Sequence, residues 1–499
     1  MFKNQPKGLI PAALSNMGER FGFYVMMAIL TLFLMSKFDL DGKEAGALYS
    51  TFYCSIYILA LVGGVIADKT KNYKGTIIAG LVVMALGYAL LAIPALITTK
   101  YIALGALLVI AFGNGLFKGN LQAVVGQLYD NPKYSAQRDS GFQIFYMFIN
   151  IGGCIAPLIA VWVRNTFVKM QGFAYNADLP GLCNKYLAGK EIDTDLFLNY
   201  ANQVSQTEVN LETLRDFAGN YLTAFNTGFH YAFSVAILAM LISLVIFLWA
   251  KKSLPTPGQK TADNGAAVSK EEIKQSAKEI KQRILALFAV FGVVIFFWFS
   301  FHQNGLTLTM FAKDYTLLKI GSLELGAEIF QSVNPFVVVF LTPVVMWLFG
   351  ALAKKGKEPS TPKKIGIGMG IAALAYIVMA VASIGLPSYS EISAAPLAES
   401  ARVTPWILFS VYFILTIAEL FISPLGLSFV SKVAPAHLQG LMQGCWLGAT
   451  AVGNACLFLG AVMYESISLT ATWSVFAGVC FISMAVMFCM VSWLERVAK

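Results

Sequence analysis

Ionisable side chains lie inside the longest apolar stretches of this sequence, where charge is costly. They are Glu19, Arg20, Lys118, His302 and Glu419. A charged side chain that faces lipid at the centre of a bilayer costs about 2.5–3.5 kcal/mol. Five such costs together are at least comparable with the whole stability of a typical domain. We therefore expect these side chains to face a shared polar interior, and the simplest such interior is a pathway for a solute.

One helix face in the first apolar stretch gathers several polar side chains. Asn16, Glu19 and Arg20 are spaced at i, i+3 and i+4, and Tyr24 follows Arg20 at i+4. Residues with these spacings share one face of a helix. An alternative is that Glu19 and Arg20 only neutralise charges on neighbouring helices, but Lys118 would then remain as a further positive charge.

The stretches that must position these groups have the length of membrane spans. Of 499 residues, 57% are hydrophobic and only 13% are charged, about half the charge of a soluble protein. An apolar helix of about 20 residues crosses the hydrocarbon core, and the blocks show no alternation typical of barrel strands. Twelve segments are predicted, near 9–36, 46–67, 74–97, 101–128, 139–164, 222–250, 284–312, 327–352, 364–387, 405–431, 440–464 and 468–494. The predicted class is an all-α integral membrane protein.

Two polar stretches interrupt the apolar pattern. Residues 251–283 lie between the first six apolar segments and the last six. The composition of their first part is typical of a flexible linker. Apolar residues at helical spacing follow, which could form either a helix on the membrane surface or a solvated connector. We predict an N-terminal six-helix bundle over 1–250, with an outer insertion at 165–221, and a C-terminal bundle over 284–499. Transporters built from two such halves bind substrate between them near the midplane.

Lysine and arginine gather in the loops on one side, so we predict that both termini are cytoplasmic in a multi-pass inner-membrane protein. The net charge of +9 is explained by these loops and does not require a nucleic-acid partner. The three histidines form no HExxH motif, and the sequence has neither GxxxxGK[ST] nor GxSxG. We therefore predict no enzymatic activity, no metal site and no cofactor.

Several motifs resemble one family in both halves of the chain. GERFGFY at Gly18–Tyr24, the stretch Gly113–Asp130 and FYxxINxG at Phe145–Gly152 match signatures of the proton-dependent oligopeptide transporters, a branch of the major facilitator superfamily. Further matches lie at Gly63–Asp68, Phe229–Phe233, Phe297–Trp298, Gln331–Pro335, Glu419–Pro435 and Gly440–Trp446. The resemblance implies a major facilitator fold of twelve helices and a monomeric secondary active transporter. It also implies that this transporter imports di- and tripeptides with protons by alternating access.

The resemblance also implies roles for single residues. Glu419, Asn150 and Asn334 match the residues that hold the amino end of a peptide, and Lys118 matches the one for its carboxylate. The pocket-lining aromatic residues are matched by Tyr24, Tyr57 and Trp446. Tyr57 and Trp446 could instead be ordinary packing aromatics, and the two asparagines could only join helices.

Departures from the family pattern leave proton coupling open. The motif's first glutamate is Asn16 here, its arginine falls on Met27, and an expected acid in the seventh segment is His302. Losing the arginine and the acid together leaves no orphan charge. Because Arg20 and Lys118 both favour the ionised form of Glu19, this carboxylate is expected to be a poor proton carrier.

His302 is the alternative titrating group, unless it is a neutral hydrogen-bonding histidine, and Glu419 is a second. The predicted coupling and gating residues are thus Glu19, Arg20, His302 and Glu419. Three rival interpretations are a transporter of the same fold for another, perhaps anionic, solute, an uncoupled facilitator, and a membrane-embedded enzyme such as a peptidase or acyltransferase. No nucleophile–base or metal constellation in the sequence supports the enzyme.

Overall fold

The computed structural model describes residues 4–40, 42–176, 179–255, 270–320, 323–324, 329–394 and 397–498. Within these ranges, twelve helices are long and apolar enough to cross a membrane. Large apolar side chains cover their outer surfaces; Trp249 and Trp347, for example, are 81% and 71% exposed. Charged side chains such as Glu19 and Glu419 are instead buried. This inversion of the soluble pattern is that of a multi-pass membrane protein, as the sequence predicts.

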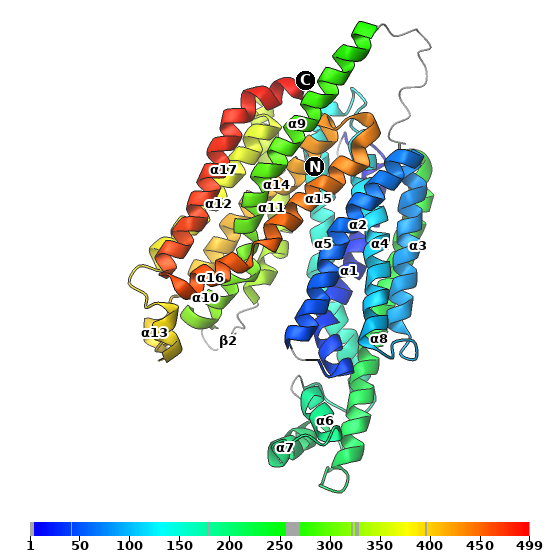
Figure 1. Cartoon of the computed structure of the whole chain (residues 1–499), viewed down its shortest axis with the longest axis vertical. Helices are drawn as coiled ribbons and strands as arrows, with labels where there is room; N and C mark the ends of the chain where they lie inside the picture. The colour runs from blue at the N-terminus through cyan, green and yellow to red at the C-terminus, as the bar shows by residue number, and fades with distance from the viewer. Residues whose placement is uncertain are drawn as a thin grey trace.

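The spanning helices form two consecutive groups (Figure 1). The N-terminal half contains α1 (Leu9–Phe38), α2 (Gly42–Thr70), α3 (Tyr73–Ala92), α4 (Lys100–Gln127), α5 (Arg138–Met170) and α8 (Leu214–Ala250). The C-terminal half contains α9 (Lys270–Phe301), α10 (Thr307–Tyr315), α11 (Ile329–Lys354), α12 (Thr361–Ala382), α14 (Pro405–Val433), α15 (Gln439–Ala455), α16 (Phe458–Ser466) and α17 (Leu469–Val497). The remaining elements are α6 (Leu179–Leu187), α7 (Thr194–Val204), α13 (Tyr389–Ala394), the antiparallel pair β1 (Lys319–Ile320) and β2 (Leu323–Glu324), and the 3₁₀ turns η1 (Ser135–Gln137), η2 (Lys251–Ser253), η4 (His302–Gly305), η5 (Glu399–Ala401) and η6 (Ala436–Leu438).

Glycine lets neighbouring spans approach closely in the N-terminal half. A Cβ added at Gly63 on α2 would lie 2.0 Å from the carbonyl oxygen of Gly115 on α4. A Cβ at Gly115 would in turn lie 2.3 Å from the carbonyl oxygen of Leu59. Small residues permit such backbone contact between membrane helices, where dispersion forces rather than hydrophobic burial drive packing. These two helices therefore form a rigid support for the side chains of α4.

Two of the predicted spans are each broken into two helices. The seventh continues from α9 into α10 through η4, and the eleventh is divided between α15 and α16. Gln303 joins the two breaks: its Nε2 donates to the carbonyl oxygens of Phe299 (3.2 Å) and Leu457 (3.3 Å), and its Oε1 accepts from Thr307 (2.9 Å). The sequence analysis predicts both spans as continuous segments, although the first break carries the polar residues His302, Gln303 and Asn304.

The two halves contact each other at the end where the described termini lie and diverge toward the opposite end (Figure 1). We call these ends the termini side and the cap side. The contacts join α2 and α4 to α15, and α5 to α11 and α14. On the termini side, the backbone amides of Gly440 and Leu441 donate to Asp68 of α2 at 3.0 and 2.8 Å. A helix N-terminus in one half is thereby capped by a carboxylate of the other.

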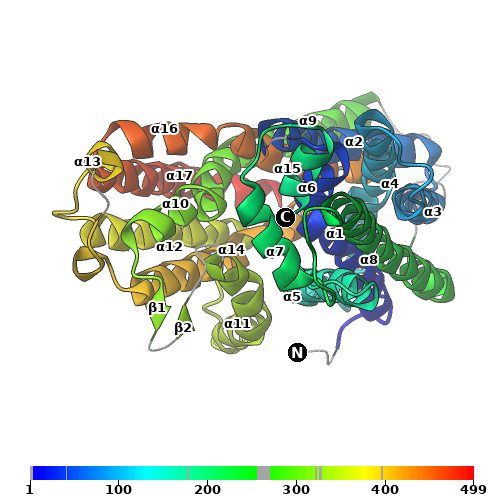
Figure 2. The ribbon, with the colours of Figure 1, turned by 90° about the horizontal axis from the view of Figure 1, so that it is seen from below.

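The two interruptions lie on opposite sides. Residues 171–213 carry α6 and α7 beyond the spanning helices, and in the view from below both lie in front of the bundle (Figure 2). They pack on the N-terminal half, where Asn184 donates to the carbonyl oxygen of Ser36 at 3.0 Å. Of the predicted linker, 256–269 lies outside the described residues, and Lys270–Arg283 forms the first turns of α9 along the axis of the seventh span.

Candidate functional site

Glu19 and Arg20 form a closed, buried ion pair on α1. Nε and Nη2 of Arg20 donate to the two carboxylate oxygens of Glu19, both at 2.5 Å. Asn114 of α4 adds a third hydrogen bond, from Nδ2 to Oε1 at 2.8 Å. Glu19 is 0% exposed and Arg20 is 4% exposed. Two parallel N–H···O bonds from Arg20 and one from Asn114 therefore leave both carboxylate oxygens of Glu19 with partners.

Lys118 lies one turn after Asn114 on α4. It is the second cation of this cluster, beside the Arg20 that pairs with Glu19. It interacts electrostatically with Arg20 and Glu19, but within the described part of the chain no carboxylate oxygen lies within 4 Å of its Nζ. Its Nζ is 5.9 Å from the ring centroid of Tyr57. Such a contact stabilises an ammonium by only about 0.5–2 kcal/mol. Lys118 is therefore available to an anionic group that enters from outside the protein.

Tyrosine side chains connect this cluster to the C-terminal half. The hydroxyl of Tyr57 donates to that of Tyr53 at 3.4 Å, and their rings meet edge to face at 5.5 Å. Tyr24, one turn after Arg20, interacts electrostatically with Arg20, Tyr53 and Glu419. Tyr24 thus lies between the charged groups of α1 and the carboxylate of α14.

Glu419 accepts hydrogen bonds from both halves of the protein. Nδ2 of Asn334 on α11 donates to Oε2 at 2.6 Å, and Tyr146 of α5 donates its hydroxyl to Oε1. Asn334 also donates to Oγ1 of Thr416 at 3.1 Å. With Glu419 5% exposed, two donors keep a buried carboxylate partnered. The site therefore closes across the interface between α5 and the pair α11 and α14.

Tyr146 is the residue that sequence reasoning did not single out. It belongs to the FYxxINxG stretch, and it lies one turn before the predicted site residue Asn150. That i, i+4 spacing was the available signal. Asn150 itself donates to the backbone carbonyl of Tyr146 at 3.0 Å, so its described hydrogen bond stays within α5.

Trp446 and His302 lie within the C-terminal half. Trp446 is 2% exposed and packs on α14, where a Cβ at Gly426 would lie 1.9 Å from its ring. His302 stacks on Trp298 with ring centroids 4.8 Å apart, and its Nδ1 is 2.5 Å from Oδ1 of Asn454 on α15. None of the described hydrogen bonds joins His302 to Glu419 or Lys118. The functional roles assigned to both residues stay predictions.

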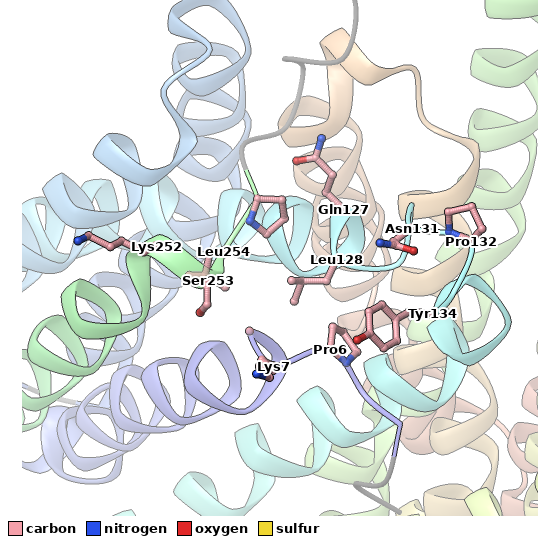
Figure 3. Close-up of a pocket in the computed structure, with 12 residues that line it drawn as sticks. Pro6, Lys7, Gln127, Leu128, Asn131, Pro132, Tyr134, Lys252, Ser253 and Leu254 are labelled. Carbon is pink, nitrogen blue, oxygen red and sulfur yellow. The ribbon is translucent and has the colours of Figure 1, made fainter.

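A cavity of about 660 Å³ opens elsewhere, on the termini side of the N-terminal half. It lies between the segment before α1, the end of α4 and the end of α8, with Lys7, Gln127, Tyr134 and Lys252 on its walls (Figure 3). None of the predicted site residues lines it. The candidate site is therefore defined by the charged groups around Lys118 on α4 and Glu419 on α14 and not by this cavity.

Known proteins resemble the chain over nearly its whole length. Its sequence is 30% identical to "Peptide transporter YePEPT" of Yersinia enterocolitica, over 94% of this chain and 91% of that protein. It is 27% identical to "Dipeptide and tripeptide permease A" of Chromobacterium violaceum, over 90% of this chain and 83% of the relative.

The fold also matches solved structures. A crystal structure of "peptide transporter POT in complex with sulfate" superimposes with a TM-score of 0.60 at 22% identity, over 100% of this chain and 96% of that one. A POT family transporter with 5-aminolevulinic acid gives a TM-score of 0.61 at 20% identity, over 100% and 98%. The predicted fold of two six-helix bundles is thereby confirmed.

The family model described as "POT family" matches residues 74–266 and 258–473. Together these matches include most of both halves. The chain therefore belongs to the POT family of membrane transporters, as the motifs on α1, α4 and α5 predicted.

Proposed function

We propose that this protein is a secondary active transporter that imports dipeptides and tripeptides across the inner membrane by alternating access. The observation that carries the proposal is the pair of complementary charges on opposite halves, with Lys118 on α4 and Glu419 on α14. A peptide at neutral pH has one positive and one negative end. The relatives of this protein include one named peptide transporter and several named dipeptide and tripeptide permeases.

The carboxylate end of the peptide meets the ammonium of Lys118, which has no carboxylate partner among the described residues. The amino end meets Glu419, where an ammonium group with three N–H donors replaces the hydroxyl of Tyr146. Asn334 keeps its hydrogen bond to the second oxygen. Because the two ends bind to different halves, a bound peptide links the halves and favours their closure around it.

We place the termini side in the cytoplasm, where the lysine-rich loops lie. The present arrangement, with the halves in contact on that side, is then the state that receives substrate from outside. Both charge clusters come from one chain, so the proposed working unit is the monomer. The proposal needs no cofactor, and it assigns no catalysed reaction.

The proposed coupling ion is a proton. Glu19 is not a candidate carrier, because Arg20 and Asn114 already donate hydrogen bonds to both of its carboxylate oxygens. Two groups remain. His302 donates from Nδ1, since the amide oxygen of Asn454 can only accept, which leaves Nε2 as its titrating atom. Glu419 is the other candidate proton carrier, because the peptide ammonium proposed to bind its carboxylate is released in each transport cycle.

Uptake of labelled dialanine into proteoliposomes tests the proposal, with pH gradient and voltage set separately. Glu419→Gln should lose uptake of peptides with a free amino end, while Glu465→Gln, an exposed carboxylate at the end of α16, should transport normally. His302→Gln keeps a donor for Asn454 and should transport by exchange but lose its response to a pH gradient if His302 carries the proton. Normal uptake by Glu419→Gln would overturn the assignment of the amino end.

A second candidate is a transporter of small anions, and it is favoured by Lys118, for which the described residues provide no carboxylate partner. Competition separates the two: amidated dipeptides and simple carboxylates are each offered against labelled dialanine. Stronger competition by carboxylates that lack an amino group would favour the anion transporter. An uncoupled facilitator would show uptake that no pH gradient changes.

A further inference from the structure

A buried lysine on the cytoplasmic side holds carboxylates from both halves at once. Nζ of Lys364, at the start of α12, lies 2.9 Å from Oδ2 of Asp139 on α5 and 2.7 Å from Oε1 of Glu358. It also lies 4.4 Å from the ring centroid of Phe349. The Lys364 side chain is 2% exposed, whereas those of Asp139 and Glu358 are 21% and 36% exposed. Of the three side chains, Lys364 would therefore be destabilised most by the loss of its partners, because water cannot replace them.

The two carboxylates differ in what happens to them when the halves separate. Asp139 belongs to the N-terminal half, yet its partners come from the other half: Lys364, Thr361 at 3.0 Å and Ser428 at 2.6 Å. Separation of the halves breaks all of these bonds together. Glu358 lies six residues before Lys364 in the same half, so their bond survives the separation.

An ammonium left buried without a partner destabilises a protein by several kcal/mol. Opening of the cytoplasmic side would impose this penalty on Lys364 if Asp139 were its only partner. Glu358 removes it, because the lysine stays paired throughout. Asp139, in the first turn of α5, is already 21% exposed while the halves are in contact, so that on separation it can exchange its lost partners for water.

We propose that Lys364 is passed from Asp139 to Glu358 as the cytoplasmic side opens, so that the two carboxylates bias the transport cycle in opposite directions. Asp139 stabilises the closed cytoplasmic side, and Glu358 makes the open one reachable. Both are positioning residues, since neither lies at the peptide site. The inference rests on the proposed function for its meaning, although the conformational change itself can be measured without a substrate.

The test is a distance between two labels on the cytoplasmic side of the full-length protein in liposomes. Spin labels are attached to Lys133→Cys, in the loop before α5, and Lys355→Cys, after α11, in a background without the native cysteines. Both positions are exposed and they lie on opposite halves. The variants Asp139→Asn and Glu358→Gln each remove one charge at nearly constant shape. Glu495→Gln, a carboxylate at 3.0 Å from Lys363 in the same region, is the matched control.

We expect Asp139→Asn to raise the ratio of open to closed forms by about tenfold, as expected for loss of a charge-assisted hydrogen bond. Glu358→Gln should lower that ratio, and Glu495→Gln should leave it unchanged. Shifts in the same direction for both variants, or no shift in either, would overturn the proposal.

A charge exchange keeps the experiment decisive even if each single variant is also less stable. Asp139→Lys combined with Lys364→Asp restores an ion pair across the interface. It also moves the lysine to the N-terminal half, so that Glu358 now binds across the interface as well. A static ion pair predicts normal distances and transport in this double variant, whereas transfer of the lysine predicts a closed protein that folds but does not transport. If the distances in the single variants behave as expected while the unsubstituted protein takes up no dialanine, the substrate assignment fails and the transfer of Lys364 stands.

Discussion

The hydroxyl of Tyr146 on α5 donates a hydrogen bond to Glu419 on α14, so a side chain of one half occupies the position proposed for the substrate's amino group in the other. In the absence of peptide, Tyr146 thus supplies the link between halves that a peptide ammonium would supply when bound. It is the described hydrogen bond that most directly connects the site to movement of the halves.

Tyr146→Phe should slow net uptake more than exchange. Without the hydroxyl, the empty transporter must close with Glu419 short of one donor, which costs about 1–3 kcal/mol. The return of the empty transporter is then slowed about tenfold, while loaded transporters still cross. Net uptake and counterflow of dialanine, measured side by side in proteoliposomes, check this. Equal losses in both assays would contradict the role assigned to the hydroxyl.

Asn334 and Asn150 should differ in their effect on peptide binding. Asn334→Ala removes a 2.6 Å hydrogen bond to Glu419, and bonds to charged groups contribute about 1.5–3 kcal/mol. The KM for dialanine should rise about tenfold or more. Asn150→Ala removes a bond to the backbone of its own helix and should raise KM much less. The reverse order would show that Asn150 turns toward the substrate on binding.

Arg20→Gln should destabilise the protein strongly. The substitution leaves the fully buried carboxylate of Glu19 with Asn114 as its remaining described hydrogen-bond donor, and loss of one partner of a buried pair costs about 3–5 kcal/mol. Thermal unfolding in detergent should show a lower Tm, with partial recovery in the double variant Glu19→Gln, Arg20→Gln. Lys100→Gln, which removes an exposed pair with Glu44, is the control and should change stability by less than about 1 kcal/mol.

Cys183 on α6 should stay poorly reactive until the solution is alkaline. Burial raises the pKa of its thiol to about 12, above the value of an exposed cysteine. Folding is therefore favoured by the neutral thiol at neutral pH, and this contribution is lost as the pH rises from about 9 toward 12. Maleimide labelling of a variant that keeps only Cys183 should be slow at pH 8 and accelerate above pH 9. A variant whose only cysteine is Lys185→Cys, at an exposed position of the same helix, should react readily at pH 8.

The twelve spans could be predicted because length and apolar composition are local properties that the bilayer itself selects. The common face of Asn16, Glu19 and Arg20 followed in the same way from helical geometry. The breaks after Phe301 and Ala455 could not be predicted in this way, because they depend on a hydrogen bond from Gln303 to the carbonyl oxygen of a residue more than 150 positions away.

The sequence predicted candidate residues for the site but not the contacts between them. Asn150 and Asn334 looked equivalent along the sequence, and packing alone directs one toward Glu419 and the other toward its own backbone. His302 was expected to replace a lost gating acid, and the structure places its hydrogen bond within the C-terminal half. Lys364 counted in the sequence only as one of many basic residues near a span end.

That the protein has twelve spans and a few costly charges follows from the amino-acid sequence, since the penalty for charge in lipid applies wherever those residues lie. Which charges meet depends on how the helices pack. Tyr146 and Glu419 are 273 residues apart and Asp139 and Lys364 are 225 apart, and hydrogen bonds act over about 3 Å, so their pairing exists only once the two halves are packed together.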